Sequence, residues 1–120
     1  MMLKIVIAGG RHFNNYDLLK SKCDSILSQK VQEGYKIIIV SGKAKGADSL
    51  GERYAKEKGY IVDEFPADWS LGPKAGPIRN EQMAAHSDAL IAFWNGKSKG
   101  TKSMINLAKK YNLSIRIIRY

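Results

Sequence analysis

The sequence predicts an α/β fold in which helices cover both faces of a five-stranded, mostly parallel sheet. Five runs rich in isoleucine and valine recur along the chain, and helical patterns lie between them. Several of these runs are continuously apolar, which is typical of parallel strands that are buried on both faces. The regular alternation of strand and helix favours a doubly wound sheet. A length of 120 residues favours one domain over residues 1–120.

The expected strands are short apolar runs. The first reads LKIVIA and the second KIIIV, and both are dominated by isoleucine and valine. The last reads SIRII and carries Arg116, and Arg119 follows it closely; charges of this kind suit a strand at the edge of a sheet. We expect strands at residues 3–8, 36–40, 60–65, 88–93 and 114–118.

The expected helices repeat apolar residues three or four positions apart. In the first helix Leu19, Cys23 and Leu27 fall on one face, so we interpret Cys23 as a small core residue. Pro77 suits the first turn of the third helix. A long irregular loop precedes that helix, and such a loop is often a lid or a binding loop. We expect helices at residues 16–32, 47–58, 77–86 and 101–111, and the loop at 66–76.

The chain is strongly basic, because 20 lysine and arginine residues against 11 acidic residues give a net charge of +9. A folded domain with this charge favours an anionic partner such as a nucleotide, a nucleic acid or another phosphate compound. The alternative is a solvated, lysine-rich surface. The single cysteine favours a cytoplasmic protein. The chain has no run of 18 apolar residues, so we expect no membrane partner.

The loops that follow the first four strands carry the unusual residues. They read AGGRHFNN, SGKAKGAD, PADWSLGPKAGPIRN and WNGKSKGT. All strand-to-helix loops of such a sheet emerge on one edge, where ligands bind, and helix N-termini there favour anions. We therefore expect a phosphate-bearing ligand at this edge; the alternative is that the glycines only form tight turns. The basic residues expected there are Arg11, Lys43, Lys45, Lys74, Arg79, Lys97, Lys99 and Lys102.

The segment FWNGKSKGTKSM contains Gly-Lys-Ser but is not a Walker P-loop. That motif needs a glycine where this chain has Ile91. The dinucleotide fingerprint is also missing, because no third glycine follows the first glycine pair into the helix. The segment instead places Ser98, Gly100 and Thr101 at the start of a helix, where amides and hydroxyls can cradle one phosphate group. The alternative is that Ser98 or Thr101 only caps the helix.

Four segments in a fixed order resemble the YspA-type, cpYpsA-related branch of the SLOG superfamily: GGRHFNNY, VSGKAKGAD, FPADWSLGPKAGPIRNEQM and SDALIAFWNGKSKGT. This superfamily also contains the DNA-processing protein DprA and the Lonely Guy phosphoribohydrolases. The resemblance runs from Lys4 to about Ala108. It implies a Rossmann-like, three-layer fold with a nucleotide or nucleotide-derived ligand at the carboxyl ends of the strands. Related folds often pair, so a homodimer is one expectation.

The Lonely Guy enzymes share an arginine, a methionine and a Gly-Thr pair with this chain, at Arg79, Met83 and Gly100-Thr101. Their catalytic glutamate corresponds to Met104, which lacks the carboxylate that hydrolysis along an oxocarbenium-like path needs. The resemblance therefore favours binding over that hydrolysis. An enzyme stays open as an alternative, with Asp48, Asp68 and Glu81 as candidate catalytic residues.

The DNA-processing protein gives a different expectation, because it binds single-stranded DNA. If this chain does the same, Trp69 and Trp94 are candidates for stacking on bases, and burial beneath the loop is the alternative for each. The positions that resemble its motifs are Ser41-Gly42, Gly46-Ala47-Asp48, Arg79-Asn80, and Ser98 with Gly100-Thr101.

Our leading hypothesis is a protein that binds an ADP-ribose-like molecule or a mononucleotide in order to sense, sequester or process it. The two alternatives are a hydrolase of nucleotides or their N-glycosidic bonds, and a single-stranded DNA-binding protein. His12 and His86 lack companions at metal-ligand spacing, so no structural metal is expected, although a nucleotide could bring Mg²⁺ with it. The expected ligand-binding residues are Gly9, Gly10, Arg11, Ser41, Gly42, Gly46, Asp48, Arg79, Asn80, Ser98, Gly100 and Thr101.

Several of these residues also have a simpler interpretation. Arg79 suits bidentate contacts to a phosphate or to ribose, but it could instead form a surface ion pair with Glu81 or Asp68. Asp48 could hold ribose hydroxyls, or it could be a first-turn carboxylate that the helix dipole favours. Asn80 could bind sugar or base, or it could brace its loop.

Overall fold

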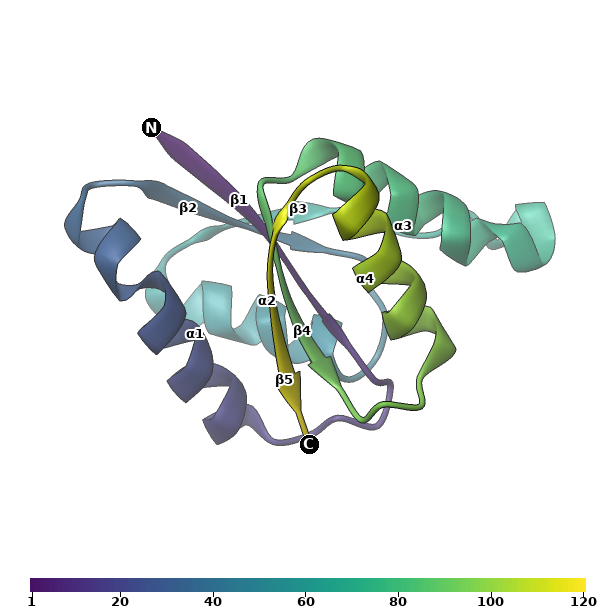
Figure 1. Cartoon of the computed structure of the whole chain (residues 1–120), viewed down its shortest axis with the longest axis horizontal. Helices are drawn as coiled ribbons and strands as arrows, with labels where there is room; N and C mark the ends of the chain where they lie inside the picture. Colours follow the sequence, from purple (N-terminus) through teal and green to yellow (C-terminus); the bar gives the residue numbers. More distant parts are fainter.

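The computed structural model describes all 120 residues. Five parallel strands form one sheet in the order β3-β2-β1-β4-β5 (Figure 1). The strands are β1 (Met2–Gly9), β2 (Lys36–Ser41), β3 (Ile61–Glu64), β4 (Ala89–Trp94) and β5 (Ser114–Arg119). The helices are α1 (Tyr16–Gln32), α2 (Ala47–Lys58), α3 (Ala75–His86) and α4 (Lys99–Lys110), with a short 3₁₀ helix η1 (Trp69–Lys74) before α3.

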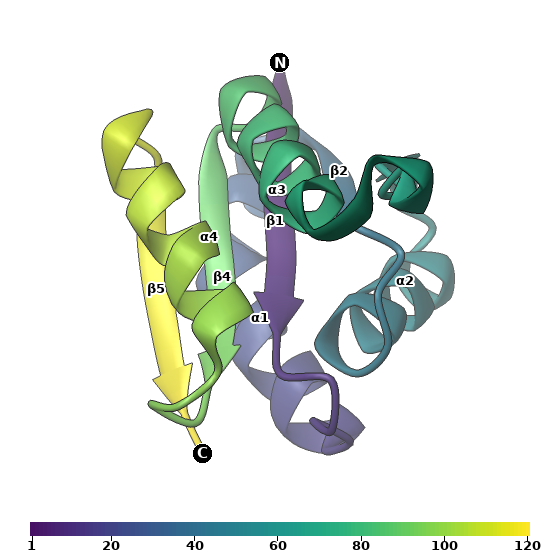
Figure 2. The same cartoon turned by 90° about the vertical axis from the view of Figure 1, so that its right-hand side faces the viewer.

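Helices cover both faces of the sheet, which gives three layers. The side chains of β1 alternate between the two faces: Ile5 and Ile7 pack with α1 and α2, whereas Val6 and Ala8 pack with α3 and α4. Figure 2 shows α3 and α4 in front of the sheet. The central strands β1, β2 and β4 are covered on both faces. This accounts for their continuous apolar runs, which are IVIA, IIIV and ALIAFW.

The order of the strands reverses at β1. The chain builds β1, β2 and β3 in one direction with α1 and α2 on one face, and it then crosses to β4 on the other side of β1. The ends of β1 and β4 pair through Gly9 and Phe93. In open parallel sheets the crevice beyond the carboxyl ends of the strands at this reversal is where ligands bind.

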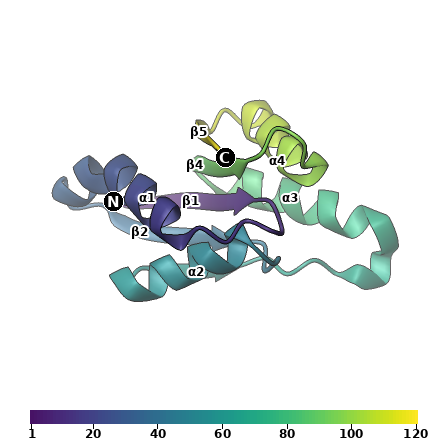
Figure 3. The ribbon, with the colours of Figure 1, turned by 90° about the horizontal axis from the view of Figure 1, so that it is seen from below.

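The segment between β3 and α3 projects away from the sheet. Figure 3 shows α3 running outward to η1 at the far end of the molecule. Within η1, Gly72 has a φ of 75°, a left-handed conformation that suits glycine. Gly72 thus allows the chain to turn within η1, in the segment that connects β3 to α3.

The predicted fold class is confirmed, with two corrections. The sheet is wholly parallel, not mostly parallel. Residues 66–76 are not an irregular loop throughout, because they contain η1 and α3 already begins at Ala75, two residues before Pro77. The strand β5 lies at the edge of the sheet and Cys23 is buried, as predicted. None of the helices has the length and apolar character needed to cross a membrane.

Candidate functional site

A crevice of about 840 Å³ lies at the carboxyl ends of the strands. Its walls come from the end of β1, the loop between β2 and α2, the segment after β3, and the first turns of α3 and α4. The volume falls within the range of about 300–1,000 Å³ that is usual for small-molecule sites. Of the predicted ligand-binding residues, the crevice is lined by Gly9, Arg11, Gly42, Asp48, Arg79, Asn80, Ser98, Gly100 and Thr101.

The crevice carries an excess of positive charge. Asp48 is the only acidic residue that lines it, and Lys43 at its rim is neutralised by Glu52 and Glu64, each 2.9 Å from the Lys43 ammonium. The remaining cations form no ion pair within 4.0 Å. These unpaired cations are Arg11, Lys45, Arg79 and Lys99. Such a crevice attracts anions.

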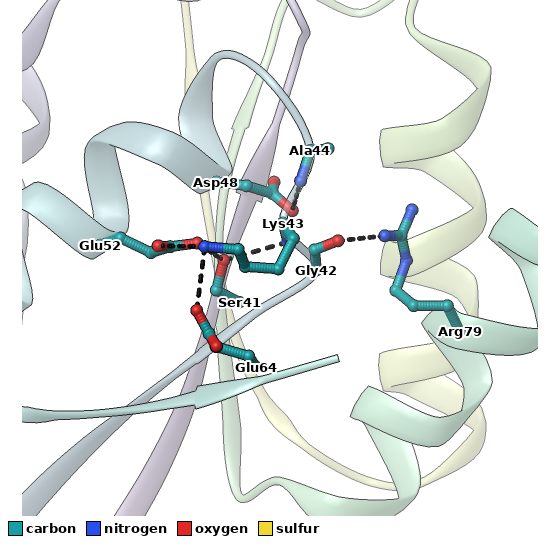
Figure 4. Close-up of polar contacts among 8 residues, drawn as sticks. All are labelled: Ser41, Gly42, Lys43, Ala44, Asp48, Glu52, Glu64 and Arg79. Atoms are coloured by element: carbon teal, nitrogen blue, oxygen red, sulfur yellow. Dashed lines mark hydrogen bonds and ion pairs between the residues drawn. The ribbon is translucent and has the colours of Figure 1, made fainter. Parts of the chain in front are cut away.

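The guanidinium of Arg79 spans the crevice from the first turns of α3. It donates a hydrogen bond to the carbonyl oxygen of Gly42 (Figure 4). Its Nε donates a second hydrogen bond of 2.9 Å to Oδ1 of Asn80. Burial lowers the pKa of Arg79, nearby Arg11 lowers it further, and Asp48 opposes both effects. Arg79 does not form the surface ion pair that was its simpler interpretation. Its remaining N–H groups are therefore available to an anion.

Asp48 lies in the first turn of α2 with only 6% of its surface exposed. Its Oδ2 accepts a long hydrogen bond of 3.4 Å from the amide of Ala44 (Figure 4). Burial raises the pKa of Asp48 to about 6, and the hydrogen bond from Ala44 and the charge of Arg79 oppose this rise. A carboxyl group with this pKa can exchange a proton near neutral pH.

The first turn of α4 forms another wall. Ser98 caps the helix, since its Oγ accepts a hydrogen bond of 3.3 Å from the amide of Thr101 and lies 2.9 Å from the Thr101 hydroxyl. Both hydroxyls therefore have a structural role, as the alternative interpretation proposed. The amides of Lys99 and Gly100 have no acceptor inside the helix, so they can donate to a ligand in the crevice.

Three of the predicted ligand-binding residues do not line the crevice: Gly10, Ser41 and Gly46. Ser41 donates to Glu52 at 2.6 Å and accepts from the amide of Lys43, away from the crevice. A Cβ atom at Gly10 would meet the hydroxyl of Tyr120. One at Gly46 would meet the carbonyl oxygens of Gly10 and Arg11. These two glycines are explained by close packing of the loops rather than by close approach of a ligand.

The two tryptophans differ. Trp69 lines the crevice and is 61% exposed, so its ring is free to stack on a base. Trp94 does not line the crevice: its Nε1 donates to the Ser98 carbonyl at 3.1 Å, and the Arg119 guanidinium lies 5.1 Å from its ring. Of the two candidates for stacking on a base, only Trp69 therefore lies at the crevice.

Of the three carboxylates named as catalytic candidates, only Asp48 lines the crevice. Asp68 caps η1, where its Oδ1 accepts hydrogen bonds from the amide and the hydroxyl of Ser70. Glu81 pairs with Lys110 at 2.9 Å on the outer side of α3 and α4. No group of three His, Cys, Asp or Glu side chains has the arrangement of a metal site.

Some residues that line the crevice were not among the predicted ligand-binding residues. Ala8, Met83 and Met104 contribute buried apolar surface beside the polar groups. Pro66 and Ala67 follow β3 at the rim. Ala8 was expected in a buried strand, and Met83 and Met104 were considered as positions of the Lonely Guy motif. Neither pattern distinguishes a core residue from one that also lines a crevice.

The model of the YspA, cpYpsA-related SLOG family matches residues 3–72. The chain belongs to this family. It is 30% identical to the Gene 61 protein of Mycobacterium phage D29, over 95% of this chain and 94% of that protein. It is 33% identical over 73 residues to the uncharacterized SPbeta prophage-derived protein YoqJ of Bacillus subtilis, which is 61% of this chain and 42% of that protein.

A solved structure also resembles this SLOG-family chain. DNA processing protein A from Helicobacter pylori, whose structure was described for its mode of binding single-stranded DNA, superposes with a TM-score of 0.67 and 22% identity. The match covers 96% of this chain and 64% of that one. This likeness supports the Rossmann-like fold.

Proposed function

We propose that this SLOG-family protein binds a nucleotide or a nucleotide derivative, such as a mononucleotide or an ADP-ribose-like molecule, in the crevice beside β1. The observation that carries the proposal is the group of four unpaired cations, Arg11, Lys45, Arg79 and Lys99, around a crevice with a single acidic residue. The phosphate would bind to Arg79 and to the free amides at the start of α4. The exposed ring of Trp69 would stack on the base.

In this proposal the protein senses, sequesters or processes its ligand. Any Mg²⁺ would enter bound to the nucleotide phosphates, because Asp48 is the only carboxylate at the crevice. The free thiol of Cys23 supports a reducing compartment such as the cytoplasm.

The test is mass spectrometry of any ligand that freshly purified protein releases on denaturation, followed by affinity measurements with nucleotides, NAD and ADP-ribose. We expect Arg79→Ala to weaken binding at least about tenfold, since it removes a charge-assisted hydrogen bond to phosphate. Arg116→Ala is the matched control, because Arg116 is exposed on β5, forms no ion pair and lies outside the crevice. If the two variants bind equally well, the crevice is not the nucleotide site.

Hydrolysis of the ligand is a second candidate function, and the position of Asp48 favours it. Asp48 is a buried carboxyl group at the crevice, and its pKa of about 6 suits a general acid or base. We expect Asp48→Asn to abolish any turnover of the identified ligand while the protein still binds it. Turnover that is unchanged in Asp48→Asn would exclude Asp48 as the catalytic group.

A further inference from the structure

A groove of about 610 Å³ lies between α3 and α4. These two helices lie side by side on one face of the sheet (Figure 2). The residues of α4 that line it recur three or four positions apart, so they form one face of that helix. The opposite face of α4, with Met104, Ile105 and Ala108, is buried against the sheet. The groove is thus bordered by an exposed face of α4 and the adjacent face of α3.

The groove adjoins the crevice. Pro77, Lys99 and Ser103 line both hollows, so the two meet at the first turns of α3 and α4. At the far end Lys110 and Glu81 bridge the two helices at 2.9 Å. The groove therefore adjoins the crevice at one end and reaches the Lys110–Glu81 ion pair at the other.

The groove has the chemistry of a site for a nucleotide unit. The helix α4 carries four lysines and no acidic residue. Lys99 and Lys102 form no ion pair, whereas Glu81, the single acid of the groove, is neutralised by Lys110. Ile78 is 40% exposed and offers an apolar surface to a base or sugar. Asn106 adds an exposed amide that can hydrogen-bond to a base.

We propose that this groove binds the second nucleotide of a phosphodiester-linked ligand, a short single-stranded oligonucleotide whose first nucleotide occupies the crevice. The phosphate that joins the two nucleotides would lie near Lys99, at the junction, and Lys102 would contact it or the next phosphate. This inference rests on the proposed function, because it assigns the crevice to the first nucleotide. The three residues that line both hollows, and the positive charge of both, favour one chain of nucleotides over two separate ligands.

The test compares Lys102→Glu with Lys109→Glu. Lys109 is an exposed lysine of the same helix that lines neither hollow and forms no ion pair, so the two variants change the net charge equally. The probes are a 5′-phosphorylated mononucleotide, the corresponding dinucleotide and a tetranucleotide, titrated at one fixed salt concentration. We expect the wild type and Lys109→Glu to bind the dinucleotide about tenfold more tightly than the mononucleotide.

We expect Lys102→Glu to lose most of that tenfold gain, and to bind the mononucleotide as Lys109→Glu does. The inference is overturned if the dinucleotide binds no better than the mononucleotide, or if the two variants weaken it equally. In those cases mononucleotide binding that still depends on Arg79 leaves the proposed function intact. If no probe shows binding that depends on Arg79, the proposed function fails and this inference fails with it.

Discussion

Asp48 and Arg79 hold charges in partly buried surroundings, on either side of the Gly42 carbonyl (Figure 4). No ion pair joins them within 4.0 Å. Buried charges are costly unless they are paired and hydrogen-bonded. Asp48 and Arg79 attract each other through space and each has hydrogen bonds, but burial still shifts both pKa values toward the neutral form. Part of the folding free energy is therefore given up at this crevice, as is common at functional sites.

At the scale of a single residue, we expect Asp48→Asn to stabilise the free protein at pH 7–8. Burial raises the pKa of Asp48 from its ordinary value of 3.8 to about 6, so the folded state binds the proton more tightly than the unfolded state does. The stability of the wild type should then fall as the pH rises from about 4 to about 6. The variant lacks this loss and should be more stable above pH 6 by up to roughly 3 kcal/mol.

Urea unfolding of both proteins across this pH range checks the prediction. Asp17→Asn is the matched control, because Asp17 is an exposed carboxylate in the first turn of α1. Its loss should destabilise the protein by less than about 1 kcal/mol. A stability difference between Asp48→Asn and the wild type that does not vary with pH would show that burial does not raise the pKa of Asp48.

At the scale of the elements, the glycine-rich loops pack against one another before they meet any ligand. Ala47 at the start of α2 donates its amide to the Gly10 carbonyl at 3.3 Å. A Cβ atom at Gly9 would lie 2.8 Å from the Cβ of Ala47. The first loop, the second loop and α2 therefore form one packed unit, and this unit fixes the position of Asp48 at the crevice.

Much of this arrangement could be predicted from the sequence, because runs of isoleucine and valine define the strands and every parallel strand ends at the same edge. The direction in which individual side chains point could not be predicted from the sequence. Ser41 turns toward Glu52, Trp94 is held by Arg119, and Gly10 packs under Tyr120. These partners are 11 or more residues away along the chain. The 3₁₀ helix η1 was missed because six residues around Pro73 show no helical period.

We expect Gly46→Ala to destabilise the protein far more than Gly59→Ala. Both glycines have positive φ values, 78° and 74°. Gly59 has left-handed helical geometry with a ψ of 23°, where a Cβ atom costs about 1–2 kcal/mol, whereas Gly46 has a ψ of −125°, which residues other than glycine adopt at a higher cost. Only at Gly46 would this atom also meet the carbonyl oxygens of the first loop, whereas nothing lies within 4 Å at Gly59. Chemical denaturation should show an additional loss of about 1–3 kcal/mol for Gly46→Ala. Equal losses would contradict the packed unit of loops.

At the scale of the whole molecule, the net charge of +9 is unevenly compensated. Most ion pairs include a residue of α1, α2 or β3, such as Lys20 with Glu57 and Lys58 with Asp24. The lysines at the start of α4 and the crevice cations other than Lys43 lack such partners. These unpaired cations around the crevice and the groove should raise the rate of association with anions and make that rate sensitive to salt.

A basic surface and a specific anion site predict different responses to added anions. Sodium chloride should raise the melting temperature of the wild type and of Arg79→Ala equally, because screening reduces the repulsion among all positive charges. Pyrophosphate at the same ionic strength should raise it further in the wild type, because a ligand that binds only the folded state stabilises that state. At about ten times its dissociation constant, this stabilisation is roughly 1.4 kcal/mol, or several degrees for a chain of this size.

The additional rise in melting temperature that pyrophosphate causes should be much smaller in Arg79→Ala than in the wild type. In Arg116→Ala it should equal that of the wild type. Thermal unfolding of the three proteins in chloride and pyrophosphate buffers of equal ionic strength tests this prediction. If pyrophosphate stabilises all three equally, anions bind across the lysine-rich surface as a whole, and the positive charge is a property of the surface rather than of the crevice. If only Arg79→Ala fails to respond, the anion site is the one at the reversal of strand order between β1 and β4, where the fold brings Arg79, Asp48 and the start of α4 together.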